Sequence, residues 1–155
     1  MMASPDDQLE ALNAHAAVRL RRIAADRGVR DLCVHLVVVD GDAPADVALE
    51  DVAGDGGGVP LPADGARYVV SFRRAVMWRV IDEAFEGRHE GAGTLEGAIL
   101  TDATVSRFLG MVRAHTYAEV ATGRQLRHYR INAVDAVIDV AAFEPPAVRV
   151  ALPKG

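Results

Sequence analysis

The stretch QLRHYRINAVDAVIDVAAF (residues 125–143) decides the fold, because it predicts two neighbouring strands. Its β-branched and apolar residues form two runs, and Asn132-Ala133 supplies a turn between them. Glu144-Pro145-Pro146 ends the second run, since proline lacks a backbone donor and favours extended backbone before it. A third apolar run follows the prolines. We therefore expect three C-terminal strands, at 125–132, 134–143 and 148–152.

Further strands are expected upstream of this stretch. Residues 29–40 (VRDLCVHLVVVD) are apolar on both faces, which predicts a central strand covered on one side by the N-terminal helix. Residues 68–72 alternate as a strand, and residues 75–85 read as its hairpin partner across the turn Arg73-Arg74, with a helix as the competing interpretation. A short strand is expected at 98–100.

Two helices complete the expected elements. Ser4 is placed to cap the first, and apolar residues recur at three- and four-residue intervals up to Ile23, which predicts about 22 residues of helix ending near Gly28. Asp102 is expected to cap the second, from Ala103 to His115. Ser106 then falls in its first turn, and the residues after Tyr117 are expected to be irregular.

Residues 40–65 differ in composition from the rest of the chain. They hold seven acidic residues, no Lys or Arg, three prolines and the glycine-rich run 54–58. This composition is typical of a long flexible connection within one domain, 1–155. The expected fold is therefore α+β, a mainly antiparallel sheet with an N-terminal helix and a mid-chain helix packed on one face.

Composition narrows the class of protein. Among 155 residues, 50% are apolar and the net charge is −5, which is ordinary for a globular domain and disfavours a nucleic-acid binder. No stretch approaches the ~18 apolar residues of a membrane span, and residues 1–10 lack the features of a signal peptide. The single cysteine, Cys33, excludes an internal disulfide. We expect a cytoplasmic protein with no nucleic-acid or membrane partner.

No cofactor or metal is expected. The five histidines form no H-x-H or H-x-x-x-H pair, and no cysteine cluster accompanies them. The glycine-rich runs lack the spacing of a phosphate-binding loop, and no serine lies in a G-x-S-x-G turn.

A loose polar set remains on the aromatic half of the chain. If residues 134–140 pair antiparallel with 128–132, Asp139 approaches His128 or the residues beside it. A histidine with a carboxylate partner is the minimum for general acid–base catalysis. It is also the pattern of a half-buried structural histidine, and we favour that interpretation. The tentative catalytic residues are His128, Tyr129, Glu83 and Arg107, around a cleft lined by Trp78.

The same region carries a resemblance. The segments His128-Tyr129-x-Ile131, Ile138-Asp139-Val140 and Glu144-Pro145 resemble the closing strands of a group of small bacterial cytosolic proteins with no assigned activity. Upstream, Tyr68-Val-Val-x-Phe72, Glu83 and Ser106-Arg107-Phe108-Leu109 fit the same pattern. The resemblance covers residues 66–146 and implies a shared sheet scaffold. It supplies no catalytic residues.

Two classes of function stay open. The first is a protein-binding or inhibitory module of the immunity type, in which acidic residues steer a basic protein partner. The residues expected to bind that partner are Asp40, Asp42, Asp46, Glu50 and Asp51. A solvated linker is the simpler interpretation of these acids. The second class is a small enzyme or ligand-binding domain using the cleft around His128. Homodimerisation through the last strand is also left open.

Overall fold

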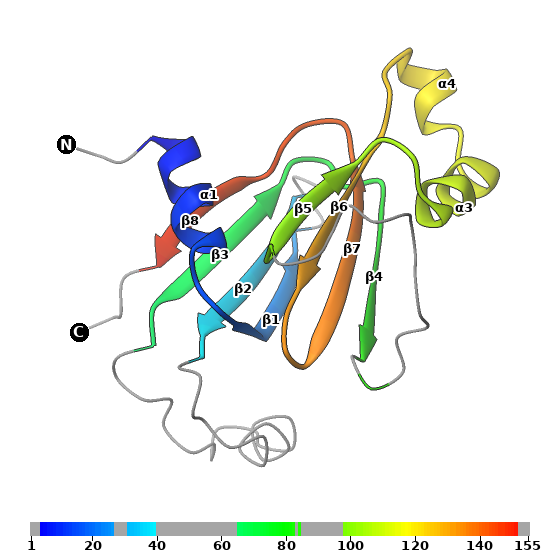
Figure 1. Ribbon diagram of the computed structural model, residues 1–155. Coiled ribbons are helices and arrows are strands. Elements are labelled where there is room, and N and C mark those ends of the chain that lie inside the picture. The colour runs from blue at the N-terminus through cyan, green and yellow to red at the C-terminus, as the bar shows by residue number, and fades with distance from the viewer. Residues whose placement is uncertain (1–3, 27–30, 40–64, 83, 85–97, 152–155) are drawn as a thin grey trace.

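A computed structural model of the chain describes residues 4–26, 31–39, 65–82, 84 and 98–151, which form two four-stranded antiparallel sheets and three helices (Figure 1). The first sheet has the order β1 (Val18–Ala25), β2 (Leu32–Val38), β3 (Arg67–Phe72) and β8 (Ala147–Ala151). The second has the order β4 (Met77–Asp82), β7 (Ala136–Ala142), β6 (Arg127–Asn132) and β5 (Leu100–Ala103). The helices are α1 (Pro5–Asn13), α3 (Arg107–His115) and α4 (Ala118–Thr122). The expected α+β class is confirmed.

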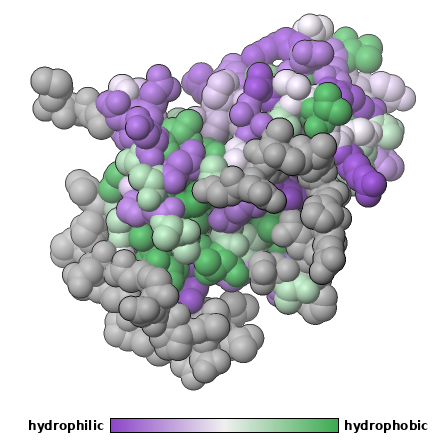
Figure 2. Space-filling model, viewed as in Figure 1, coloured by the Kyte–Doolittle hydropathy of each residue, from purple (hydrophilic) through white to green (hydrophobic). Residues whose placement is uncertain are grey.

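The main core lies between the two sheets. Alternate residues of each strand point to the same side, and those on the inner faces form one buried cluster that includes Val34, Phe72, Ile131 and Ile138. α1 packs against the edge strands β8 and β5, and its Leu12 joins this core. In the space-filling view, hydrophobic residues gather where α1 meets the sheets and hydrophilic residues cover its outer side (Figure 2).

The outer faces of the two sheets differ. α3 contacts β6 and β7 on the outer face of the second sheet, where Phe108, Leu109 and Val112 form a second buried cluster with Ala141. Within the described part of the chain, no helix packs in this way on the outer face of β1, β2 and β3.

The N-terminal helix is shorter than predicted. It ends at Asn13, and the residues expected to continue it form β1. Leu20 and Ile23 match a helical spacing, but a register shift between Leu20 and Arg22 lets both face the core from a strand. Pairing with β2 supplies a partner for this backbone and overrides the helical pattern. β2 is internal, as expected, but α1 packs against β8 and β5 rather than over it.

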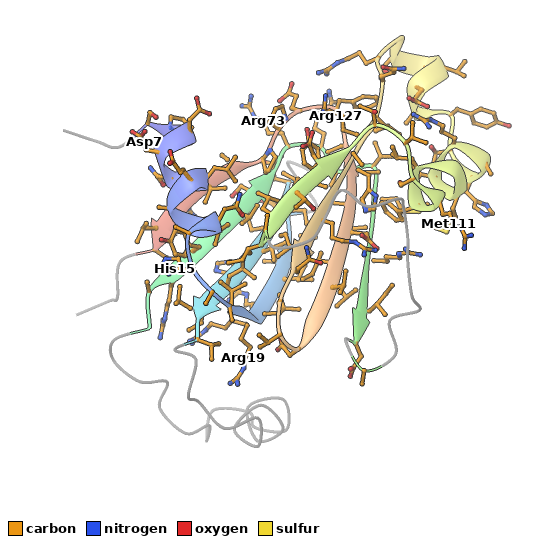
Figure 3. All side chains as sticks on the ribbon, viewed as in Figure 1. Asp7, His15, Arg19, Arg73, Met111 and Arg127 are labelled. Atoms are coloured by element: carbon orange, nitrogen blue, oxygen red, sulfur yellow. The ribbon has the colours of Figure 1, made fainter. Side chains whose placement is uncertain are left out.

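The expected start of the second helix is also wrong. Asp102 lies in β5, which pairs with β6, and its carboxylate forms an ion pair with Arg127, the residue of β6 that is labelled in Figure 3. The helix begins after Ser106, whose hydroxyl oxygen accepts a hydrogen bond from the backbone N–H of Leu109 at 3.0 Å. α4 also replaces the irregular segment expected after Tyr117.

Residues 77–82 are a strand, which excludes the helical alternative for that part of the range 75–85. The predicted hairpin with β3 is wrong, however, because β3 and β4 belong to different sheets. Arg74 adopts a left-handed φ of 50° where the chain turns from one sheet to the other.

The C-terminal strands and the turn between β6 and β7 are confirmed. The connection predicted at 40–65 lies almost entirely outside the described residues. No helix in the described ranges is long and apolar enough to cross a membrane.

Candidate functional site

A buried carboxylate, Asp139, lies at the centre of the second sheet. β7 is flanked by β4 and β6, and the register places Arg79 and Arg130 directly beside Asp139 on the two neighbouring strands. His128 lies two residues from Arg130 and therefore on the same face. The side chains of Arg79, Arg130 and His128 thus converge on Asp139. This carboxylate is 0% exposed, so solvent does not reach it.

Hydrogen bonds join all four residues. Arg79 Nε donates to Asp139 Oδ2 at 2.8 Å, and Arg130 Nε donates to Oδ1 at 2.8 Å. Arg130 also donates through its second nitrogen, Nη2, to Oδ2 at 3.3 Å. His128 Nε2 lies 2.6 Å from Oδ1. Because a carboxylate only accepts hydrogen bonds, the histidine proton on this side belongs to Nε2.

These bonds hold Asp139 in its ionised form. Burial favours the neutral carboxyl and would raise its pKa, but the hydrogen bonds from His128, Arg130 and Arg79 outweigh burial and hold the pKa well below its ordinary value. The cluster therefore contains a fixed negative charge matched by neighbouring positive charge.

Residues at the start of α3 contact the cluster. Ser106 Oγ lies 2.8 Å from His128 Nδ1, while the same oxygen accepts the N–H of Leu109. An imidazole with its proton on Nε2 can accept the Ser106 hydroxyl proton at Nδ1 and satisfy both nitrogens. The Phe108 ring lies over His128, with centroids 4.8 Å apart, and the Arg79 guanidinium lies 5.0 Å from the same ring.

The structure does not bring the described candidate catalytic residues together. Tyr129 follows His128 on β6 and therefore points to the opposite face, into the core beside Phe72. Arg107 is exposed on α3, and Trp78 lies on the face of β4 opposite to Arg79. Glu83 lies outside the described residues, as do Asp40, Asp42, Asp46, Glu50 and Asp51.

The sequence predicted that Asp139 approaches His128 or the residues beside it, but it assigned no ion pair with Asp139 to Arg130 or Arg79. The signal was present, because Arg130 shares a face with His128, and Arg79 alternates with Trp78 and Val80 on a strand that was predicted. What the sequence lacked was the order of the strands, which places β7 between β4 and β6.

A Ser–His–Asp sequence of contacts is also found in nucleophilic catalysis. Here His128 is 1% exposed, and Asp139 is bound by two arginines as well as the histidine. A general base must be within reach of substrate, and this imidazole has both nitrogens occupied by protein groups. The arrangement is that of a structural network. In the described ranges, no three His, Cys, Asp or Glu residues lie together as a candidate metal site.

Replacing His128 with alanine is expected to lower the free energy of unfolding by about 1–3 kcal/mol, because Asp139 and Ser106 each lose a buried hydrogen bond. Urea unfolding followed by circular dichroism measures this. His115→Ala is the matched control, since His115 is exposed at the end of α3. Equal stability of the two variants would contradict a structural role for His128.

Comparison with known proteins adds no further assignment: no family model, no curated protein and no solved structure matches the chain. The resemblance to small bacterial cytosolic proteins stays a prediction.

Proposed function

We propose that this protein is a protein-binding module that docks a partner along β4. The observation that carries the proposal is the exposure of two large apolar side chains on this strand, Trp78 at 40% and Val80 at 47%. Neighbouring apolar side chains that stay this exposed on an edge strand favour a docking surface.

The position of this pair within the fold explains its exposure. In the register of β4 and β7, Trp78 lies opposite Val140 and Val80 opposite Ile138, and both β7 residues are 0% exposed in the core between the sheets. Trp78 and Val80 therefore lie on the core-facing side of the second sheet, beyond the part that the first sheet covers. α1 covers the corresponding opening at the β8–β5 edges.

β4 can also bind a partner through its main-chain groups. It is an edge strand of its sheet, and an edge strand can accept an extended segment of another protein through backbone hydrogen bonds. Charged residues protect many edges from such pairing, but the charge of Arg79 is matched by Asp139. A partner strand would thus meet a tryptophan anchor, and tryptophan is enriched among residues that dominate binding energy.

The burial of His128 and Asp139 favours this function over the enzyme alternative, two of whose candidate residues, His128 and Tyr129, point to opposite faces of β6. Inhibition of a basic partner, steered by the acidic residues between positions 40 and 51, is a narrower form of the proposal. The two forms differ in salt dependence, because an apolar contact persists where an exposed charge contact is screened.

The test is capture of a partner by the tagged protein from its own cells at ~50 and ~300 mM salt, followed by titration of the captured protein. We expect Trp78→Ala/Val80→Ser to weaken binding at least about 30-fold, roughly 2 kcal/mol, at both salt concentrations. Trp78 is the single tryptophan, so a change in its emission on binding reports contact directly.

The matched control is Val105→Ser/Val120→Ser, which removes two exposed valines located away from β4. This control should bind like the wild type. Unchanged binding by the Trp78/Val80 variant would overturn docking at β4. If binding were instead lost both at ~300 mM salt and on neutralising Asp40, Asp42, Asp46, Glu50 and Asp51, the acidic residues would be the binding surface.

A further inference from the structure

The outer face of the first sheet carries a cluster of positive charge. The strand register places Arg22 of β1 beside His35 of β2, His35 beside Val69 of β3, and Val69 beside Arg149 of β8. Arg67 shares this face, two residues from Val69 on the same strand. We call Arg22, His35, Arg67 and Arg149 the cationic face.

Among the described residues, no acid neutralises the charges of this face. Arg22, Arg67 and Arg149 form no hydrogen bond or ion pair within the part of the chain that the structure describes. Burial lowers the pKa of His35, and the positive charges of Arg22, Arg149 and Arg21 lower it further. Arg19, at the lower end of β1 (Figure 3), differs because its charge acts on Asp135. Guanidinium groups that no acid pairs with in the described part of the chain favour an anion, in a protein whose net charge is −5.

The spacing indicates what kind of anion fits. Arg22 and Arg149 lie on the two outer strands of the four-stranded sheet, about 14 Å apart in backbone position at the usual distance between strands. Both are exposed. The next row consists of the small side chains Ala24, Cys33, Ser71 and Ala147. Val69, between His35 and Arg149, is buried, so the exposed charges lie at the two sides of the face, an arrangement that suits several separated negative charges better than one small ion.

We propose that the cationic face binds an acidic segment of a partner protein, with Arg22 and Arg149 each holding a carboxylate on either side of His35. Arginine matches the geometry of a carboxylate through two parallel N–H bonds. The rows of the face given above contain no tryptophan, tyrosine or phenylalanine, the side chains on which unpaired bases stack. This distinguishes an acidic polypeptide from a single-stranded nucleic acid.

The experiment measures binding of poly-L-glutamate to the full chain by isothermal titration calorimetry at low salt. We expect Arg22→Glu/Arg149→Glu to weaken binding at least about tenfold and to flatten its salt dependence. The charge-matched control is Arg73→Glu/Arg107→Glu, which changes the net charge equally at two exposed arginines outside the cationic face. It should weaken binding less than about threefold, because only long-range attraction changes. Circular dichroism confirms that both variants fold.

Three other outcomes would overturn the proposal. Equal losses in the two variants would show a response to net charge alone. Tighter binding of single-stranded oligothymidylate than of poly-L-glutamate would assign the face to nucleic acid. Binding could also appear only in a variant in which the acids of residues 40–51 are neutralised, namely Asp40, Asp42, Asp46, Glu50 and Asp51. That result would mean that the cationic face binds the chain's own acidic residues rather than a partner. The inference is independent of docking at β4, because Trp78→Ala/Val80→Ser should bind poly-L-glutamate like the wild type.

Discussion

Replacing Asp139 with alanine is expected to lower the free energy of unfolding by about 3–5 kcal/mol. Asp139 accepts hydrogen bonds from Arg130 and His128, and both of these side chains are buried. Removing it takes one hydrogen-bond acceptor away from each of these buried groups and from Arg79. Breaking a buried pair costs more than the pair contributes, because the remaining charge stays desolvated. Urea unfolding at neutral pH measures the loss.

The same carboxylate predicts how stability depends on pH. Its pKa is lower in the folded protein than the ordinary value near 4 that it has when unfolded. The unfolded state therefore binds the proton more tightly. The contribution of Asp139 is complete above about pH 4 and is lost progressively as the pH falls below that value. Asp139→Asn should consequently be less stable at neutral pH, and its stability should fall less steeply in acid.

Glu144→Ala is the control for both measurements. Glu144 forms an ion pair with Arg124 at 3.6 Å, but both side chains are about half exposed. Exposed pairs contribute little, so the control should remain within about 1 kcal/mol of the wild type. An Asp139→Ala variant as stable as this control would contradict the role assigned to the buried cluster.

The C-terminal strands could be predicted because local and tertiary preferences agree there. Residues 125–143 alternate on strand periodicity, and β6 and β7 pair with each other through a short turn, so neighbours in sequence are neighbours in space. This proximity also allowed the contact between His128 and Asp139 to be inferred. Arg79 could not be assigned in the same way, since β4 is separated from β7 by more than fifty residues of chain.

The errors occurred where two local patterns compete. Leu20 and Ile23 satisfy a helical spacing, and only pairing with β2 selects a strand with a register shift. Asp102 and Ser106 are both good helix caps, and the choice depends on whether Ala103 finds a partner in β6, which it does at His128. The division into two sheets has the same origin, because nothing in Arg73-Arg74 indicates that the chain crosses from one sheet to the other.

Replacing Leu12 with alanine is expected to lower the free energy of unfolding by about 2–5 kcal/mol. Leu12 is fully buried at the end of α1, a nine-residue helix that is too short to be stable alone. Its docking brings Asn13 to β5, where the side-chain amide donates to the Leu100 carbonyl at 3.3 Å and its oxygen accepts the Leu100 N–H at 2.9 Å. Losing the leucine both leaves a cavity and weakens these bonds.

Leu9→Ala is the matched control, because Leu9 packs against the same core but is only partly buried. We expect Leu12→Ala to cost clearly more, and hydrogen exchange of the Leu100 amide to accelerate with it. Equal small losses would mean that α1 is not needed to close the β8–β5 edges of the two sheets. A clearly larger loss of stability in Leu12→Ala than in Leu9→Ala would show that an edge of this fold requires an apolar element packed against it. The exposed Trp78 and Val80 on β4 would then mark a second edge with the same requirement, one that a partner protein can meet.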